Sequence, residues 1–187
     1  MDAPRNTAEV KERHRFDVGA LATWMEVGDL EVRQFRGGQS NPTYWISDGQ
    51  QCWVLRKKPP GKLLPSAHQV EREARVMRAL ADTDVPVAAV HALCEDPSVI
   101  GTPFFLMEHV GGRIFWNVQL HEQTPAERAA IYDELARVLA AIHSVDLDAV
   151  GLRDFGKPDR YVERQIQRWS AQYQQSETST IAAMDNS

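Results

Sequence analysis

The sequence has little cysteine and no long apolar run, and each absence excludes a class of protein. Cys52 and Cys94 are the only cysteines among 187 residues. They are too few for a disulfide framework and too far apart for a metal knuckle, so we expect both to be reduced core residues. No stretch reaches the roughly 20 apolar residues of a membrane span, and residues 1–17 lack the apolar core of a signal peptide. We therefore predict a cytoplasmic protein with no membrane partner.

An excess of basic charge is also missing. The chain has 21 Lys and Arg against 26 Asp and Glu, a net charge of −5. Such a balance does not attract the phosphate backbone of nucleic acid, which we therefore do not expect as a partner. The 43% of hydrophobic and 25% of charged residues are ordinary for a globular protein that buries a core.

The first part of the chain has the alternating pattern of strands, interrupted by helical spacing over residues 66–81. Asp17 is placed to cap a short helix before the first strand, and Asp48-Gly49 provides a hairpin turn. We predict an α+β fold with a five-stranded antiparallel sheet and one packed helix. The expected strands are residues 30–35, 44–47, 52–56, 87–93 and 104–107.

The second part of the chain is helical. Thr124, Pro125 and Glu127 form the signature of a capping box ahead of a helix over 125–143, and a further helix is expected over 159–175. The apolar stripe of the first helix contains Tyr132, Leu135, Leu139 and Ile142, and that of the second contains Val162, Ile166, Trp169 and Tyr173. We expect a loose arm over 1–16, a sheet domain over 17–110, a helical segment over 111–175 and a frayed tail over 176–187.

Three segments of the sheet domain could hold a nucleotide. Glycine lets the turn at 37–41 direct backbone N–H groups toward phosphate oxygens, although a plain hairpin turn is the alternative. Val54 and Arg56 share one face of a strand, which suits a base and its phosphates, although a solvated strand end would also explain Arg56. An anionic partner would hold Arg56 in place, and Glu73, beside the apolar stripe of the 66–81 helix, is favoured over Glu71.

The third segment follows the last strand. The backbone of Glu108, His109 and Val110 can present N–H and C=O groups to the edge of a base, with Met107 as a wall of the pocket or a core residue. His109 is interpreted as a loop residue and not as a catalyst.

These segments together resemble the aminoglycoside phosphotransferase family, a branch of the protein-kinase-like fold. The resemblance covers about residues 18–175 and is closest to the branch that occurs alone or fused to acyl-CoA dehydrogenases. It rests on the motifs Phe35-Arg36-Gly37-Gly38-Gln39-Ser40-Asn41-Pro42-Thr43-Tyr44, Val54-Leu55-Arg56-Lys57-Lys58-Pro59-Pro60-Gly61, Val70-Glu71-Arg72-Glu73-Ala74 and Phe105-Leu106-Met107-Glu108-His109-Val110.

The resemblance implies a kinase-like N-lobe over 17–110 and an incomplete helical C-lobe. It implies ATP as the nucleotide and a hydroxylated small molecule, such as a hydroxylated acyl-CoA, as the acceptor of the phosphoryl group. By this resemblance Arg56 takes the basic position of the third strand, where many relatives carry Lys. The implied nucleotide-binding residues are Gly37, Gly38, Gln39, Ser40, Asn41, Val54, Arg56, Glu73, Met107, Glu108, His109 and Val110.

Part of the family's pattern is missing from these residues. Phosphoryl transfer needs an aspartate followed five residues later by an asparagine. None of the asparagines in this sequence has an aspartate five residues before it. The tripeptide Asp154-Phe155-Gly156 resembles a metal-binding motif, but we interpret it as a connector, since no catalytic loop precedes it. No catalytic or metal-binding residue is therefore assigned, and Mg²⁺ is expected only in a full-length form.

We accordingly expect a chain that is truncated before its catalytic segment and inactive alone. The helical stripes would then be exposed, which favours self-association. A non-catalytic module that binds a nucleotide or a partner is the main alternative, and a helical interaction protein without a ligand is a further one.

Overall fold

The computed structural model describes residues 3–37, 41–61, 68–156 and 159–176. The chain divides into two compact units, Met1–Asp146 and Leu147–Ser187. The first unit contains the sheet and three α-helices, and the second contains one helix, α4 (Tyr161–Ser176). The candidate site described below lies within the first unit.

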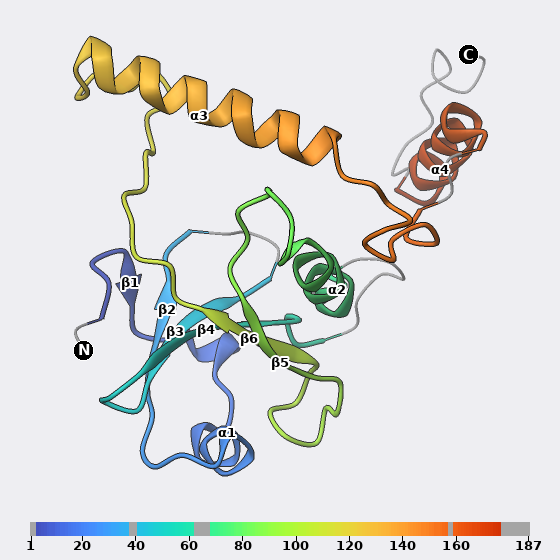
Figure 1. Cartoon of the computed structure of the whole chain (residues 1–187). Coiled ribbons are helices and arrows are strands. Elements are labelled where there is room, and N and C mark those ends of the chain that lie inside the picture. The colour runs from blue at the N-terminus through green and yellow to red at the C-terminus, as the bar shows by residue number, and fades with distance from the viewer. Residues whose placement is uncertain (1–2, 38–40, 62–67, 157–158, 177–187) are drawn as a thin grey trace. The chain divides into compact units, whose positions relative to one another are not determined.

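The first unit is built on an antiparallel sheet (Figure 1). Its strand order is β1-β2-β3-β4-β6-β5. The predicted antiparallel sheet is confirmed, but it has six strands and not five. The strands are β1 (Thr7–Ala8), β2 (Glu31–Phe35), β3 (Thr43–Ser47), β4 (Cys52–Lys57), β5 (Val90–Cys94) and β6 (Phe104–Glu108).

The additional strand, β1, lies within the segment that was expected to be a loose arm. It pairs with the end of β2 through Thr7 and Ala8. Thr7 is buried, and its hydroxyl donates to the carbonyl of Pro4 and accepts from Nε of Arg33. A strand of two residues is too short to show alternation, which is why the sequence pattern did not predict it.

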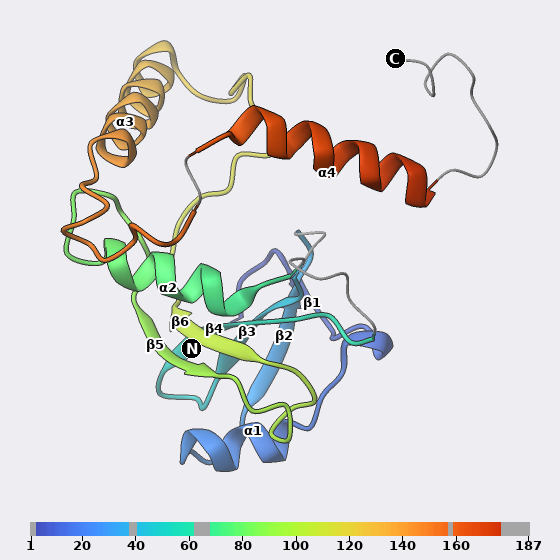
Figure 2. The same cartoon turned by 90° about the vertical axis from the view of Figure 1, so that its right-hand side faces the viewer.

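Two helices cover opposite faces of the sheet, α1 (Val18–Met25) on one side and α2 (Val70–Leu80) on the other (Figure 2). Asp17 caps α1 as predicted, since its Oδ1 accepts from the backbone N–H of Ala20 at 2.9 Å. Helix α2 begins at Val70, later than the expected residue 66, and residues 62–67 are outside the described part of the chain.

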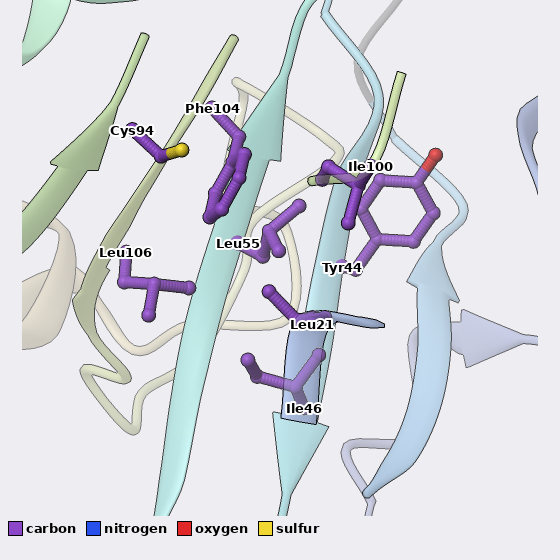
Figure 3. Packing of buried hydrophobic residues seen from close by; sticks show 8 residues of the cluster. All are labelled: Leu21, Tyr44, Ile46, Leu55, Cys94, Ile100, Phe104 and Leu106. Atoms are coloured by element: carbon purple, nitrogen blue, oxygen red, sulfur yellow. The ribbon is translucent and has the colours of Figure 1, made fainter. Parts of the chain in front are cut away.

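The α1 face of the sheet carries the larger core (Figure 3). Because side chains alternate along a strand, Tyr44 and Ile46 of β3 and Leu55 of β4 point to this face, where they meet Leu21 of α1. Cys94 belongs to this core as predicted, whereas Cys52 is only half-buried.

The α2 face holds a smaller core and the candidate site. Val70 and Ala74 of α2 pack against Phe105 of β6, and all three are fully buried. This packing fixes α2 over the strands β4 and β6. Since Arg56 lies opposite Phe105 in the sheet register, the Arg56 side chain is on the same face as α2.

Helix α3 (Pro125–His143) begins with the predicted capping box. The Thr124 hydroxyl accepts from the backbone N–H of Glu127, and the Glu127 carboxylate accepts from the backbone N–H of Thr124 at 2.9 Å. No residue of α3 is buried. Among the described residues, no helix combines the length and the apolar character that crossing a bilayer requires.

Candidate functional site

An ion pair between β4 and α2 forms the centre of the candidate site. Nε of Arg56 donates to Oε2 of Glu73 at 2.5 Å, and a second nitrogen, NH2, lies 3.4 Å from Oε1. The third nitrogen, NH1, donates to the Thr43 hydroxyl of β3 at 3.1 Å. The side chains of Arg56 and Glu73 are 29% and 36% exposed, so the pair is open to solvent and to a ligand.

The predicted choice of Glu73 over Glu71 agrees with the contacts. Glu71 pairs instead with Lys58, whose Nζ lies 2.5 Å from Oε1 of Glu71. Two neighbouring ion pairs thus join the end of β4 to the first turns of α2. What Arg56 and Glu73 do toward a ligand stays a prediction.

A buried amide holds the ion pair from the glycine-turn side. Asn41 is 3% exposed, and its Nδ2 donates to Oε1 of Glu73 at 2.8 Å. Its Oδ1 lies 2.8 Å from Nδ1 of His68, so Nδ1 of the imidazole carries the proton that Oδ1 accepts. Asn41 was expected to offer its backbone to phosphate, whereas its side chain links the glycine turn to α2 and to His68, two residues before α2.

The guanidinium of Arg56 retains donors for a ligand. An arginine has five N–H bonds, and the contacts to Glu73 and Thr43 use three of them. The two others have no partner among the described residues. Because Glu73 holds the guanidinium in a fixed plane, these donors are pre-oriented for a phosphate or carboxylate.

An apolar cleft of about 640 Å³ adjoins the ion pair. Val54 and Met107 lie opposite each other in the register of β4 and β6, and both line the cleft. The end of β6 and the segment that follows it form the rim, through residues that include Glu108, His109 and Val110. No hydrogen bond of the described residues engages the backbone of Val110, so its N–H and C=O are open to a ligand.

The segment after the rim reaches the glycine turn. A Cβ atom added at Gly37 would lie 2.9 Å from Cη2 of Trp116. A side chain at position 37 would therefore require the indole of Trp116, a residue that is 72% exposed, to shift. Gly38, Gln39 and Ser40, the other predicted residues of the turn, lie outside the described residues.

The predicted site residues that the structure describes fall into two groups. Asn41, Arg56 and Glu73 are in direct contact. The second group surrounds the apolar cleft and contains Val54, Met107, Glu108, His109 and Val110. Gly37 belongs to neither group and lies two residues after the end of β2.

Sequence reasoning missed three side chains of the site: Thr43, His68 and Trp116. The spacing of Thr43 and Arg56 in the hairpin could have revealed the first, since the Asp48-Gly49 turn places them opposite each other. The contacts of His68 and Trp116 depend on chain segments far apart in sequence.

His109 has a neighbour that the sequence did not suggest. Its Nδ1 lies 3.7 Å from Sγ of Cys52 at the start of β4. This contact fixes the imidazole at the rim of the cleft, in keeping with its interpretation as a loop residue.

Comparison with known proteins identifies the family. A model of the phosphotransferase enzyme family, APH, matches residues 31–187. A solved structure from Ralstonia eutropha, assigned as an aminoglycoside phosphotransferase, is 52% identical and superposes with a TM-score of 0.73. That alignment covers 91% of this chain and 51% of the other. The expectation of a kinase-like fold is thereby supported.

Curated relatives show which branch of the family the chain resembles. Acyl-CoA dehydrogenase family member 11 of Rattus norvegicus is 44% identical over 99% of this chain and 25% of its own length. Acyl-CoA dehydrogenase family member 10 of Mus musculus is 48% identical over 96% of this chain and 18% of its own length. The chain thus spans a quarter or less of these relatives. It belongs to the phosphotransferase enzyme family, in the branch whose kinase-like domain also occurs in acyl-CoA dehydrogenase family members 10 and 11.

Proposed function

We propose that the protein is an ATP-dependent phosphotransferase and that this chain supplies its nucleotide-binding part. In the proposed reaction the γ-phosphoryl group of ATP passes to the hydroxyl oxygen of a small molecule, with ADP as the leaving group and the hydroxyl proton released. Membership of the phosphotransferase family supports the reaction class. The observation that carries the proposal is the Arg56–Glu73 ion pair beside the apolar cleft.

The cleft has the properties that a purine base requires. Its volume of about 640 Å³ lies within the range of ligand pockets, roughly 300–1,000 Å³. Val54 and Met107 would contact the faces of the base, and the open backbone groups of Val110 would bind its polar edge. The volume and apolar lining of the cleft support the proposal that it holds an adenine base.

The phosphate groups of ATP would lie toward Arg56. Its two remaining N–H donors suit phosphate oxygens, and Glu73 prevents the guanidinium from turning away. A phosphate loop needs its backbone to approach the ligand closely, and glycine at position 37 is consistent with that need. ATP supplies the activated phosphoryl group, and the role of these residues is to bind and orient it.

We further propose that these 187 residues bind ATP without transferring its phosphoryl group. The sequence contains no aspartate followed five residues later by asparagine, and transfer needs such groups to orient the acceptor and to hold metal. In the described part of the chain, no three His, Cys, Asp or Glu side chains are close enough together to hold a metal ion. Acceptor and metal would then be bound by further residues of a longer protein.

The acceptor is proposed to be a hydroxylated metabolite. Relatives of 44% and 48% identity bear the name acyl-CoA dehydrogenase, which makes a hydroxylated acyl-CoA the first compound class to test. A non-catalytic nucleotide-binding module is the second candidate function, and the missing aspartate–asparagine pair favours it for this chain by itself.

Calorimetric titration of the chain with ATP tests the nucleotide proposal. Arg56→Ala removes the charged donors, and we expect ATP affinity to fall at least about tenfold. Lys58→Ala is the matched control because it breaks the neighbouring ion pair on the same strand and helix, and we expect it to change the affinity less than about twofold. Equal affinity of the Arg56→Ala variant and the unchanged chain would refute the proposal.

A turnover assay tests whether these residues transfer the phosphoryl group by themselves. We expect no ATP-dependent phosphorylation of a hydroxylated acyl-CoA by these residues alone. Measurable transfer that Asp154→Ala abolishes would show that the connector motif holds metal, contrary to our interpretation.

A further inference from the structure

We propose that a second cleft, on the glycine-turn side of the sheet, binds an anion with two adjacent phosphate groups. The cleft lies between η1 (Glu12–His14), the end of β2 and the residues that follow β4. Its volume is about 530 Å³. Neither Arg56 nor Glu73 lines this cleft, although it borders their site through Thr43 and His68. The proposal does not depend on ATP binding.

The lining of this cleft is basic. Lys11 and Arg13 come from the N-terminal segment and Arg36 from the end of β2, and the imidazoles of His14 and His68 complete the polar wall. None of its lining residues is acidic. In a chain of net charge −5, a cleft with three cations and no acid is a local reversal of charge that would attract anions.

Within the described part of the chain, the three cations have no anionic partner. No ion pair among the described residues includes Lys11, Arg13 or Arg36, whereas Arg56 and Lys58 on the adjoining strand are both paired. All three side chains are exposed at the cleft. Their charges are therefore free to bind a ligand without first breaking a contact.

A buried amide holds the cleft in shape. Gln34 is 7% exposed, and its Oε1 accepts from the backbone N–H of Lys11 at 3.1 Å. Its Nε2 lies 2.9 Å from Nδ1 of His14. Both contacts tie η1 to β2, so the wall that carries Lys11 and Arg13 is pre-organised and does not need to fold around a ligand.

The same amide sets the proton of His14. Since Nε2 of Gln34 can only donate, Nδ1 of His14 must accept, and the neutral ring carries its proton on Nε2. Burial lowers the pKa of His14 below its ordinary value of 6.5, and the charges of Arg13, Lys11 and Lys57 lower it further. Of these three charges, Lys11 and Arg13 line the cleft, and neutral His14 adds a donor beside them.

The arrangement favours a diphosphate over a single carboxylate. Cations reach the cleft from two separate segments, and each arginine can bind two phosphate oxygens side by side. One carboxylate could satisfy only one of these groups. The diphosphate could be inorganic or part of a larger metabolite, and both share the chemistry that the cleft recognises.

Titration of the full chain with inorganic pyrophosphate at constant ionic strength tests the proposal. We expect saturable binding that Lys11→Gln combined with Arg13→Gln weakens at least about tenfold. The control combines Arg137→Gln with Arg153→Gln, which removes the same charge from exposed positions outside the cleft, and we expect a change below about twofold. Arg36→Gln, on a different element, should weaken binding as well.

Three results would overturn the proposal. They are the absence of saturable binding, an equal loss in the two double variants, and a parallel loss of ATP affinity in the Lys11 and Arg13 variant. The last result would make the cleft part of the nucleotide site, which it borders at Phe35 and Thr43.

Conversely, Arg56→Ala should weaken the binding of ATP and leave the binding of pyrophosphate unchanged. Titration with an alkyl diphosphate distinguishes inorganic diphosphate from a diphosphate that is part of a larger metabolite. If the ligand is such a metabolite, the alkyl diphosphate should bind at least as tightly as pyrophosphate, and if it is inorganic, the alkyl diphosphate should bind more weakly.

Discussion

Lys57 places a charged group inside the core on the α1 face of the sheet. The residue is only 3% exposed. Its Nζ lies 5.0 Å from the ring centroid of Phe16 and 3.5 Å from the carbonyl oxygen of Ile100. These partners replace only part of the water that the ammonium loses. Burial therefore lowers the pKa of Lys57 below its ordinary value of 10.5.

The lowered pKa predicts how stability depends on pH. Between the folded and unfolded pKa values the unfolded chain binds more protons, so this group makes the free energy of unfolding rise as pH increases toward 10.5. Lys57→Met keeps the side-chain volume and removes the buried charge. We expect it to increase the free energy of unfolding at about pH 7 by roughly 1 kcal/mol, and the gain to shrink at about pH 10.

Urea unfolding at the two pH values measures the effect. Lys58→Met is the matched control because Lys58 is paired with Glu71, and losing that pair should give no gain in stability at either pH. A Lys57→Met variant less stable than the unchanged chain at both pH values would show that the contacts to Phe16 and Ile100 outweigh the cost of burial.

Asn41 offers a second prediction at the scale of a residue. Asn41→Ala leaves Glu73 and His68 without the amide that both contact. We expect the free energy of unfolding to fall by about 1–2 kcal/mol and ATP affinity to fall with it, because Glu73 holds Arg56 less firmly. Urea unfolding and calorimetric titration measure the two effects. Asn117→Ala, at an exposed asparagine, should change stability by less than about 0.5 kcal/mol, and an equal effect of the two variants would contradict the role of Asn41.

Individual residues of the site were predictable where a strand or helix period places them. Alternation along β4 put Val54 and Arg56 on one face, and the stripe of α2 put Glu73 toward the sheet. The link from His68 through Asn41 to Glu73 could not be predicted. It joins segments 27 and 32 residues apart, and no period in the sequence encodes such a contact.

At the scale of elements, strong local signals gave the right boundaries. The capping box places the start of α3 at Pro125, and the helix ends at His143 as expected. Both depend on contacts within a few residues, which a sequence displays directly. The start of α2 and the existence of β1 depend on tertiary packing, and there the sequence pattern was insufficient.

The two C-terminal helices show a further limit of periodic patterns. Spacing predicts which residues share a face but not whether anything covers that face. Tyr132, Leu135, Leu139 and Ile142 of α3 are 48–59% exposed. In α4, Val162, Ile166 and Trp169 are 62–68% exposed. The predicted stripes are present, and each is largely exposed within the unit that contains it.

At the scale of the whole molecule, the family match and the exposed apolar stripes both indicate which part of the chain would contact another copy of it. The Ralstonia eutropha structure is about twice as long as the part that this chain covers. The sheet packs two hydrophobic cores against its faces, whereas α3 contributes no buried residue. The sheet therefore has the packing needed to fold, and the apolar face of α3 is the part that would drive contact between copies of the chain.

We expect this chain to self-associate through the apolar face of α3. Leu135→Gln combined with Leu139→Gln should shift sedimentation velocity toward the monomer and lower the binding of a dye for apolar surface by more than about half. The free energy of unfolding should change little, because both side chains are more than half exposed. Ala126→Gln combined with Ala130→Gln, on the opposite side of the same helix, is the control and should leave association unchanged. A chain that is monomeric with little dye binding before any substitution would show that the apolar face of α3 is not a contact surface between copies.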